Sequence, residues 1–379
     1  MRWLSWVVMS FLAFCLSGCA TGLQELSTPR IRVGGLPYPG LTFYVALEQP
    51  VNLGTHRYQT MPGLGDDSDE VSRGIVYTRH AGFIDMAHVR STIDWVRYVY
   101  LVTLDRLMAT DLSMAPPLRW SWLGMDYQMS FRAPKKWTEI PESRRLLLAQ
   151  EAAKILAQRL ATSISTWHEI GSWHGQMIVP PIQEIRSAFT WDDTSSHVLA
   201  ALVGAGALST ANPHLQEDWN KAVTRELGLA MAALVPVDQD CQNQALARSQ
   251  GLWWSSGQTL RRDLDTGLQG AEPKRPWLVK DLRCADSAAL AADRASLAWA
   301  FQLPDWRELN QSTGLSFETL FDWEVTMPNW LAERVRGCGT LCAPHVFRGE
   351  ADLLLAIERI RTQVEQQSGA KALSPDESR

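Results

Sequence analysis

The segment from Thr166 to Gly175, TWHEIGSWHG, contains the residue types that bind metals and transfer protons. In the HExxH motif of zinc peptidases, two histidines four residues apart hold one metal, and the glutamate activates water. Here Ser172 replaces the second histidine, and His174 follows His168 at a spacing of about 120° around an ideal helix. A continuous helix therefore cannot direct both imidazoles to one ion; only a bend at one of the segment's glycines would allow it.

Two further segments place acids and histidines at helical spacing. Asp85 and His88 share one face of a helix if this segment is helical. Asp193 and His197 have the i, i+4 spacing that metal ligands on a helix use. Both segments therefore offer partners to a site formed around TWHEIGSWHG.

Together the three segments predict one candidate site. His88 and His168 are candidate ligands of a divalent metal such as zinc, or orient water, and Glu169 is the candidate general base. We expect these side chains to point into one cavity, with Asp85 and Asp193 on its rim. The five residues are the candidate catalytic set.

Each candidate also has a structural explanation, which the sequence leaves open. Asp85 stands where a helix N-cap belongs, with Ile84 and Val89 placed as a hydrophobic staple. Thr190 and Asp193 form a variant capping box. Single histidines in cores are more often hydrogen-bonded than metal-bound. The case for a site therefore depends on convergence of the three segments.

The N-terminus predicts secretion and a lipid anchor. The apolar run Trp3–Leu16 is shorter than the roughly 20 residues of a spanning helix, so 1–18 is predicted to be a signal peptide. It ends in LSGC, which resembles the bacterial lipobox. On that resemblance Cys19 begins the mature chain and carries diacylglycerol and an acyl chain such as palmitate, enough for stable membrane attachment. Ala20, where Asp would favour the inner membrane, indicates an outer-membrane address facing the periplasm.

Composition indicates a folded protein on that anchor. Of 379 residues, 46% are hydrophobic and 20% charged, which is enough apolar material for a sizeable core. We expect a lipid-anchored linker over 19–28, a globular periplasmic domain over 29–365 and a disordered tail over 366–379; two subdomains, 29–210 and 211–365, are an alternative. The net charge of −5 argues against a nucleic-acid partner.

Cysteine usage agrees with an oxidising compartment. Beyond the signal and the anchor, the chain has Cys241, Cys284, Cys338 and Cys342. Three pairings are possible, and the simplest joins Cys241 to Cys284 and Cys338 to Cys342. A zinc site is disfavoured because no CxxC pair is present. We therefore predict disulfides.

Periodicity predicts an α+β fold that is mainly α, with long amphipathic helices packed with a small β-hairpin or sheet component. Apolar residues recur at helical spacing from Ile84 to about Thr110, and a second long helix opens at Pro141 and runs into TWHEIGSWHG. Alternating apolar residues on both sides of Leu123-Gly124 predict a hairpin. Further elements are expected as a strand at 41–49 and as helices from Thr190 and at 215–234, 287–301, 317–335 and 350–366.

Four motifs resemble a known family: LGTHRY, GIVYTRHAGFIDMAHVRSTIDW, TWHEIGSWHG and SAFTWDDTSSH. Together they are similar to the bacterial lipoproteins grouped as domain of unknown function 4056, over roughly residues 29–210. The resemblance implies an envelope lipoprotein and transfers no activity or substrate. It also implies that a position like His197 is commonly Asn and one like His174 often Tyr, which weakens both as metal ligands.

Two functions from different classes remain, and whether the protein is an enzyme stays open. The first is a metal-dependent or acid–base hydrolase acting on an envelope substrate such as peptidoglycan. The second is a non-catalytic lipoprotein that binds a glycan or protein partner through an aromatic-rich surface. The chain has 17 tryptophans, and Trp167, Trp173 and Trp191 lie near the candidate site, although tryptophan also fills cores.

Overall fold

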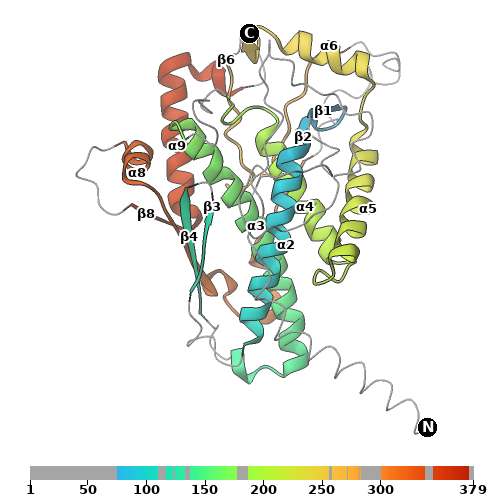
Figure 1. The fold of residues 1–379 in the computed structure, drawn as a ribbon, viewed down its shortest axis with the longest axis vertical. Coiled ribbons are helices and arrows are strands. Elements are labelled where there is room, and N and C mark those ends of the chain that lie inside the picture. The colour runs from blue at the N-terminus through green and yellow to red at the C-terminus, as the bar shows by residue number, and fades with distance from the viewer. Residues whose placement is uncertain are drawn as a thin grey trace.

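A computed structural model describes residues 75–109, 117–122, 124–132, 137–176, 187–255, 258–270, 272–280, 282, 300–337 and 345–374. These residues form long helices and small antiparallel sheets, which confirms the predicted mainly α, α+β class (Figure 1). The strand expected at 41–49 lies outside the described residues. The helix expected at 287–301 also lies outside them except for its last two positions.

Three helices pack side by side in the centre: α2 (Met86–Met108), α3 (Glu142–Trp173) and α4 (Asp193–Leu208) (Figure 1). The expected amphipathic α2 is instead buried on nearly all sides. Helices α2 and α4 approach closely at Gly204, where a Cβ atom would lie 2.9 Å from a side-chain atom of Val96. Gly204 therefore lets the two helices pack closely against each other.

Helix α3 is continuous through the TWHEIGSWHG segment and ends at Trp173. His174 caps it, with its backbone N–H directed at the last carbonyls, and Gly175 follows at a φ of 94° that favours glycine. The segment is thus the end of a long helix, as predicted. No break in the helix brings His168 and His174 onto one face.

Two hairpins flank the helices. Strands β1 (Ile75–Thr78) and β2 (Gly82–Asp85) pair directly before α2. The predicted hairpin is β3 (Leu118–Trp122) with β4 (Met125–Phe131), and it belongs to an antiparallel sheet of order β3-β4-β7-β8. Along β4 every second residue is buried, as its alternating sequence requires.

The helix predicted over 317–335 is wrong. The chain forms a 3-10 turn at Phe317–Thr319, strand β7 (Phe321–Thr326) and helix α8 (Asn329–Arg336). Apolar residues alternate in β7, which fits a strand paired with β4, and Pro328 separates the strand from the helix. Strand β8 (Val346–Arg348) completes the sheet.

The remaining elements surround this centre. Helices α5 (Gln216–Leu234) and α9 (Gly349–Ser368) confirm the predictions at 215–234 and 350–366. Not predicted were α6 (Gln239–Ser249), α7 (Arg307–Thr313) and the short pair β5 (Trp254–Ser255) with β6 (Gln258–Thr259).

The predicted disordered tail is partly wrong. Residues up to Ser368 belong to α9, and a 3-10 turn follows at Ala370–Leu373. Ala372 is buried, and its carbonyl oxygen accepts from the backbone N–H of Arg262. This segment is therefore ordered by packing that its polar composition does not reveal.

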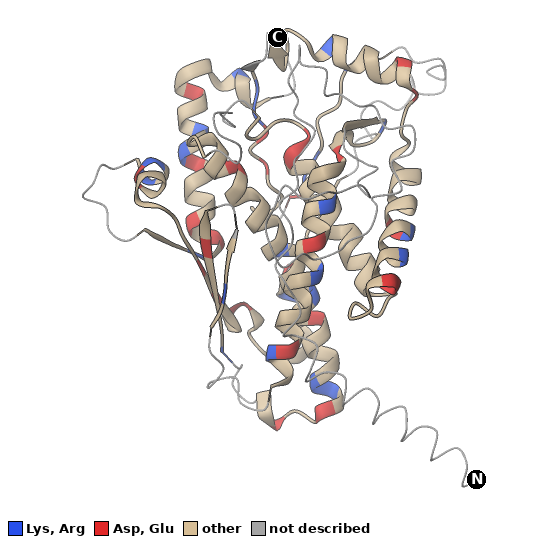
Figure 2. Ribbon diagram, in the orientation of Figure 1, with Lys and Arg blue, Asp and Glu red and all other residues tan. Residues whose placement is uncertain are grey.

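Charge and cysteines complete the description. Figure 2 shows basic and acidic residues interspersed along the helices. Within the described ranges, no helix is both long enough and apolar enough to cross a membrane.

Cys241 on α6 is buried and disulfide-bonded. The other three cysteines, Cys284, Cys338 and Cys342, lie outside the described residues, so both pairings stay predictions.

Candidate functional site

The beginning of α2 is tied to the beginning of α4. Asp85 caps α2: its Oδ1 accepts from the backbone N–H groups of Ala87 (2.7 Å) and His88 (3.4 Å). The N–H of Asp85 donates to Ser196 Oγ on α4 at 2.8 Å. The predicted N-cap is confirmed, and this cap also sets the position of His88.

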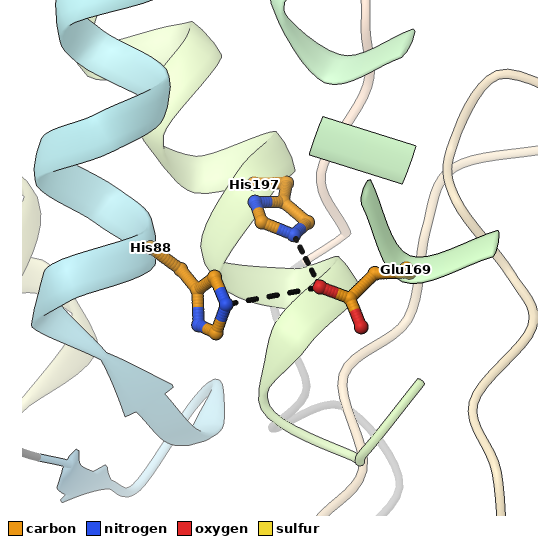
Figure 3. A group of neighbouring side chains, drawn as sticks. All are labelled: His88, Glu169 and His197. Atoms are coloured by element: carbon orange, nitrogen blue, oxygen red, sulfur yellow. Dashed lines mark ion pairs between the residues drawn. The ribbon is translucent and has the colours of Figure 1, made fainter. Parts of the chain in front are cut away.

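A histidine, a glutamate and a second histidine meet where α2 and α4 begin and α3 ends (Figure 3). Glu169 Oε1 lies 3.8 Å from His88 Nε2 and 3.8 Å from His197 Nε2. The two imidazoles make an edge contact with their centroids 4.9 Å apart. Glu169 and His197 are buried, whereas the His88 side chain is 21% exposed. The cluster thus reaches solvent at His88.

The outer atoms of this cluster are held by other elements. His197 Nδ1 is 3.1 Å from Thr92 Oγ1, which in turn contacts Ser165 Oγ at 3.0 Å. Glu169 Oε2 accepts from the N–H of Phe189 at 3.1 Å, and Phe189 has a left-handed φ of 55°. Such strain in a non-glycine residue is concentrated at functional sites. These contacts leave Glu169 Oε1 and His197 Nε2 directed at the centre.

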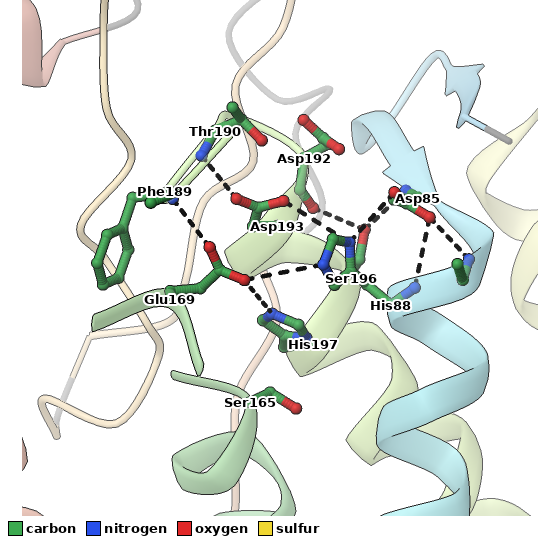
Figure 4. Close-up of polar contacts among 12 residues, drawn as sticks. Asp85, His88, Ser165, Glu169, Phe189, Thr190, Asp192, Asp193, Ser196 and His197 are labelled. Carbon is green, nitrogen blue, oxygen red and sulfur yellow. Dashed lines mark hydrogen bonds and ion pairs between the residues drawn. The ribbon is translucent and has the colours of Figure 1, made fainter. Parts of the chain in front are cut away.

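Two consecutive aspartates begin α4 beside the cluster (Figure 4). Asp193 Oδ2 accepts from the N–H of Thr190 at 2.7 Å, and Oδ1 lies 3.7 Å from His88 Nδ1. The predicted capping box is half formed, because the Thr190 hydroxyl has no hydrogen-bond partner. Asp192 is fully buried, and neither of its carboxylate oxygens makes a hydrogen bond of good geometry, although the Thr190 hydroxyl and the N–H of Asp192 itself lie near enough to act against the rise in its pKa.

Mutual interaction shifts the pKa values of the groups in the cluster. Burial opposes ionisation of Glu169, but the surrounding imidazoles outweigh it and lower its pKa to about 2. Burial lowers the pKa of His197 to about 4. Burial likewise disfavours the charged form of His88, yet its acidic neighbours, Asp85 first, raise its pKa. Without an ion, the site therefore pairs a cationic His88 with an anionic Glu169 beside a neutral His197.

The pKa values of Asp192 and Asp193 shift upward, in the opposite direction from the pKa of Glu169. Burial and the nearby Asp85 raise the pKa of Asp192 to about 7. Burial and Glu169 raise the pKa of Asp193. The site therefore contains more carboxylates than its own cations can keep ionised.

Most of the predicted set comes together. His88, Glu169, Asp85 and Asp193 lie in the cluster, as the contacts above describe. His168 lies near enough for its charge to affect Glu169, but it is not one of the three residues whose ligand atoms lie within 4.8 Å of one another. His197 takes that place.

Three residues at the site were absent from the predicted set. His197 and Asp192 belong to it; the i, i+4 spacing with Asp193 had indicated His197, but the resemblance to the family, in which this position is commonly Asn, kept it out of the set. Arg262 is buried, donates to the carbonyl of Ala188 and lies over the ring of Trp173 at 5.3 Å. Burial lowers the pKa of Arg262 to about 10, although two carboxylates of the site oppose this. No motif in the surrounding sequence indicates that Arg262 belongs to the site.

The geometry of the three central atoms suits a metal ion. Two ligands bound to a tetrahedral zinc at about 2.0–2.1 Å lie roughly 3.3 Å apart. The 3.8 Å separations from Glu169 Oε1 to His88 Nε2 and to His197 Nε2 are close to this value. Two imidazoles and one carboxylate leave a fourth position open, as in catalytic zinc sites.

The fold and the cluster define a mainly helical α+β protein with a buried site of histidines and carboxylates. A family model described as "Protein of unknown function (DUF4056)" matches residues 16–264, more than half of the chain, and the chain belongs to this family. The match extends beyond the 29–210 of the expected resemblance. No curated protein and no solved structure matches the chain.

Proposed function

We propose that this chain is a metal-dependent hydrolase whose ion is held by His88 Nε2, His197 Nε2 and Glu169 Oε1. The observation that carries the proposal is the position of Glu169 Oε1, 3.8 Å from both ring nitrogens in a buried cluster. His197 Nε2 is buried without a hydrogen-bond partner, which is costly, and a divalent ion would satisfy it together with His88 Nε2 and Glu169 Oε1. This ligand set replaces the predicted pair of His88 and His168.

The residues around the ligands support the chemistry. A bound zinc lowers the pKa of its water to about 7 and supplies a nucleophile. The Thr92 hydroxyl at Nδ1 orients His197, and the N–H of Phe189 fixes Glu169. Because the His88 side chain is partly exposed, a substrate can reach the open coordination position from that side.

The proposed substrate is an envelope polymer such as peptidoglycan, because the sequence predicts lipid anchoring at Cys19 in the outer membrane, facing the periplasm. Cys19 lies outside the described residues. Replacing Cys19 with Ser is expected to release the protein from the membrane fraction. Full retention of that variant in the membrane would refute the lipid anchor without bearing on the metal site.

The alternative, a binding protein with an aromatic-rich surface, receives less support. Trp167, Trp173 and Trp191, the tryptophans that suggested it, are all buried. Trp167 packs on Phe347, and Trp191 packs on Trp253. Core packing accounts for these three rings.

The test combines metal content with activity. The purified full-length chain is expected to contain a stoichiometric divalent ion and to release fragments from purified peptidoglycan, an activity lost with a chelator and regained with zinc. Glu169→Gln removes the anionic ligand and should lose the activity and the ion of this site while its circular dichroism stays native. Glu217→Gln, at an exposed position on α5, is the control. A metal-free, fully native wild-type chain would overturn the proposal.

A further inference from the structure

A second group of polar atoms without hydrogen-bond partners lies on the other side of His88. It consists of Asp85 Oδ2, His88 Nδ1 and both carboxylate oxygens of Asp192. One ligand atom from each of these residues lies within 4.8 Å of the others. His88 Nδ1 and Asp85 Oδ2 form an ion pair at 3.2 Å whose geometry falls short of a good hydrogen bond, which leaves the Asp192 oxygens as the least satisfied members of the group. Buried groups in native proteins rarely stay unsatisfied in this way.

Asp192 is the informative member of the group. It is fully buried at the beginning of α4, but it does not cap that helix. Asp85, by comparison, accepts the capping hydrogen bonds of α2 with its Oδ1, and only its Oδ2 lacks a hydrogen-bond partner. Helix capping thus explains the burial of one carboxylate oxygen of Asp85, but it explains neither carboxylate oxygen of Asp192.

The charge of the cluster also exceeds what one ion neutralises. Its four buried carboxylates are Asp85, Glu169, Asp192 and Asp193. One divalent ion at the first site offsets two of these charges, and the buried guanidinium of Arg262 offsets a third. A buried carboxylate that lacks both a counter-charge and a hydrogen bond is strongly disfavoured.

We infer that Asp85 Oδ2, the Asp192 carboxylate and His88 Nδ1 bind a second divalent cation, such as zinc or manganese, beside the first. The inference rests on the proposed function, because His88 then serves one cation through each ring nitrogen. As the second cation binds, the remaining ring proton of His88 leaves to solvent, and the imidazolate bridges the two ions. Carboxylate and imidazole donors suit both metals.

The competing explanation is a proton shared between Asp85 and Asp192, which would keep one of them neutral. A shared proton needs no second metal, so the number of ions per chain separates the two explanations. The probe is zinc alone: the full-length chain is stripped with a chelator and dialysed against a low micromolar excess of ZnCl₂. Bound zinc per chain is then measured by mass spectrometry of the metal.

Five proteins are compared. Wild type is expected to bind two zinc ions, and Asp192→Asn one. His197→Asn, which alters the first site only, is also expected to bind one. Asp238→Asn changes an aspartate that caps α6 through the N–H of Cys241, so it is a matched control and should bind two. Asp192→Ser is a second variant in case the amide misfolds, and near-UV circular dichroism verifies each fold.

Each outcome decides between the two sites. A wild type with one zinc, lost in His197→Asn and kept in Asp192→Asn, overturns the second site and leaves the first. One zinc that is lost only in Asp192→Asn overturns the ligand set of the proposed function and leaves the second site. Two zinc ions that both persist in Asp192→Asn and Asp192→Ser overturn the second site, and no bound zinc overturns both.

Discussion

Two regions of this protein bury charged groups, and they do so in opposite ways. Lys274 and Asp263 form a fully buried pair in which the ammonium donates to Asp263 Oδ2. Asp263 Oδ1 accepts from the N–H of Asp265, and the backbone of Lys274 pairs with Phe301 in both directions. The Lys274 ammonium therefore has one buried carboxylate as its main partner, with the partly exposed Asp265 at 4.0 Å, and nearly every polar atom has a partner.

In the candidate site, by comparison, several buried polar groups lack a hydrogen-bond partner. Asp192 and Asp85 leave carboxylate oxygens without hydrogen bonds, and His197 Nε2 has no hydrogen-bond partner either. The two regions are adjacent: Asp263 donates its N–H to the carbonyl of Phe189, whose own N–H holds Glu169. Buried charge by itself is therefore no sign of function here. The informative sign is buried charge whose partners are missing.

The largest effect on stability is expected where the charges are matched. Lys274→Met should lower the free energy of unfolding by about 3–5 kcal/mol, because it leaves the carboxylate of Asp263 buried without a cation. Chemical denaturation with an unchanged slope measures this loss.

The double variant Lys274→Met, Asp263→Asn tests the reason for that loss. Removing the orphaned charge as well should restore part of the stability, since a buried pair is costly to break on one side only. If the double variant is no more stable than Lys274→Met, the pair is not matched in the way described.

The second effect belongs to the unmatched site. Zinc at about 100 times its dissociation constant should stabilise the chelator-treated chain by about 2.7 kcal/mol, which raises the melting temperature of a 379-residue chain by roughly 3–5 °C. His197→Asn should reduce this rise to the part that an ion at the second site supplies, because it removes one of the two ring nitrogens at Glu169. Equal stabilisation of both proteins by zinc would mean that the ion binds elsewhere.

His174 is an intermediate case, because it is buried as a neutral group and its Nε2 has no hydrogen-bond partner. Burial, and after it Arg334, lower the pKa of His174 to about 4 from the usual 6.5. The unfolded chain therefore takes up a proton near pH 6.5 that the folded chain refuses until about pH 4, so stability falls over that window. By pH 5 the loss should reach about 2 kcal/mol.

Melting temperatures between pH 7.5 and 5 measure this effect. His174→Tyr should remove the part of the decline in stability that His174 contributes, since tyrosine stays neutral over the whole range, whereas His197, whose pKa burial also lowers to about 4, keeps its own part. An identical decline in both proteins would assign the acid sensitivity to other groups.

Much of the fold was predictable because local patterns determined it. The helices α2 and α3 and the hairpin of β3 with β4 follow from periodicity, capping residues and turn residues. Strand β7 was missed because its partner strand β4 lies far away in the sequence. Its short alternating run was included in the helix predicted over 317–335. The order near Ala372 was missed because a contact with Arg262 creates it.

The site was predictable to the extent that it depends on helix ends. Asp85, His88, Glu169 and Asp193 were chosen from spacing, and the three helices bring them together. The choice between His168 and His197 needed the direction of each side chain, which the packing of α3 against α4 sets.

A smaller effect is expected at the cap of α2. Asp85→Ala should be about 1 kcal/mol less stable than Asp85→Asn in the metal-free chain, because asparagine can still accept from the N–H groups of Ala87 and His88. Comparing the two variants with each other removes the effect of the lost charge. Equal stability of both would show that the cap contributes nothing.

The smallest effect is expected at Asp192, although it is as buried as Asp85. With its pKa raised to about 7 by burial and by Asp85, this carboxyl is largely neutral at pH 6 in the metal-free chain, and asparagine resembles the neutral acid in size and polarity. Asp192→Asn should therefore change the free energy of unfolding at pH 6 by less than about 0.5 kcal/mol. A loss comparable to that of Asp85→Ala, measured by denaturation without metal, would mean that Asp192 has a structural partner, and the contrast between the matched and unmatched regions would then fail at its most distinctive residue.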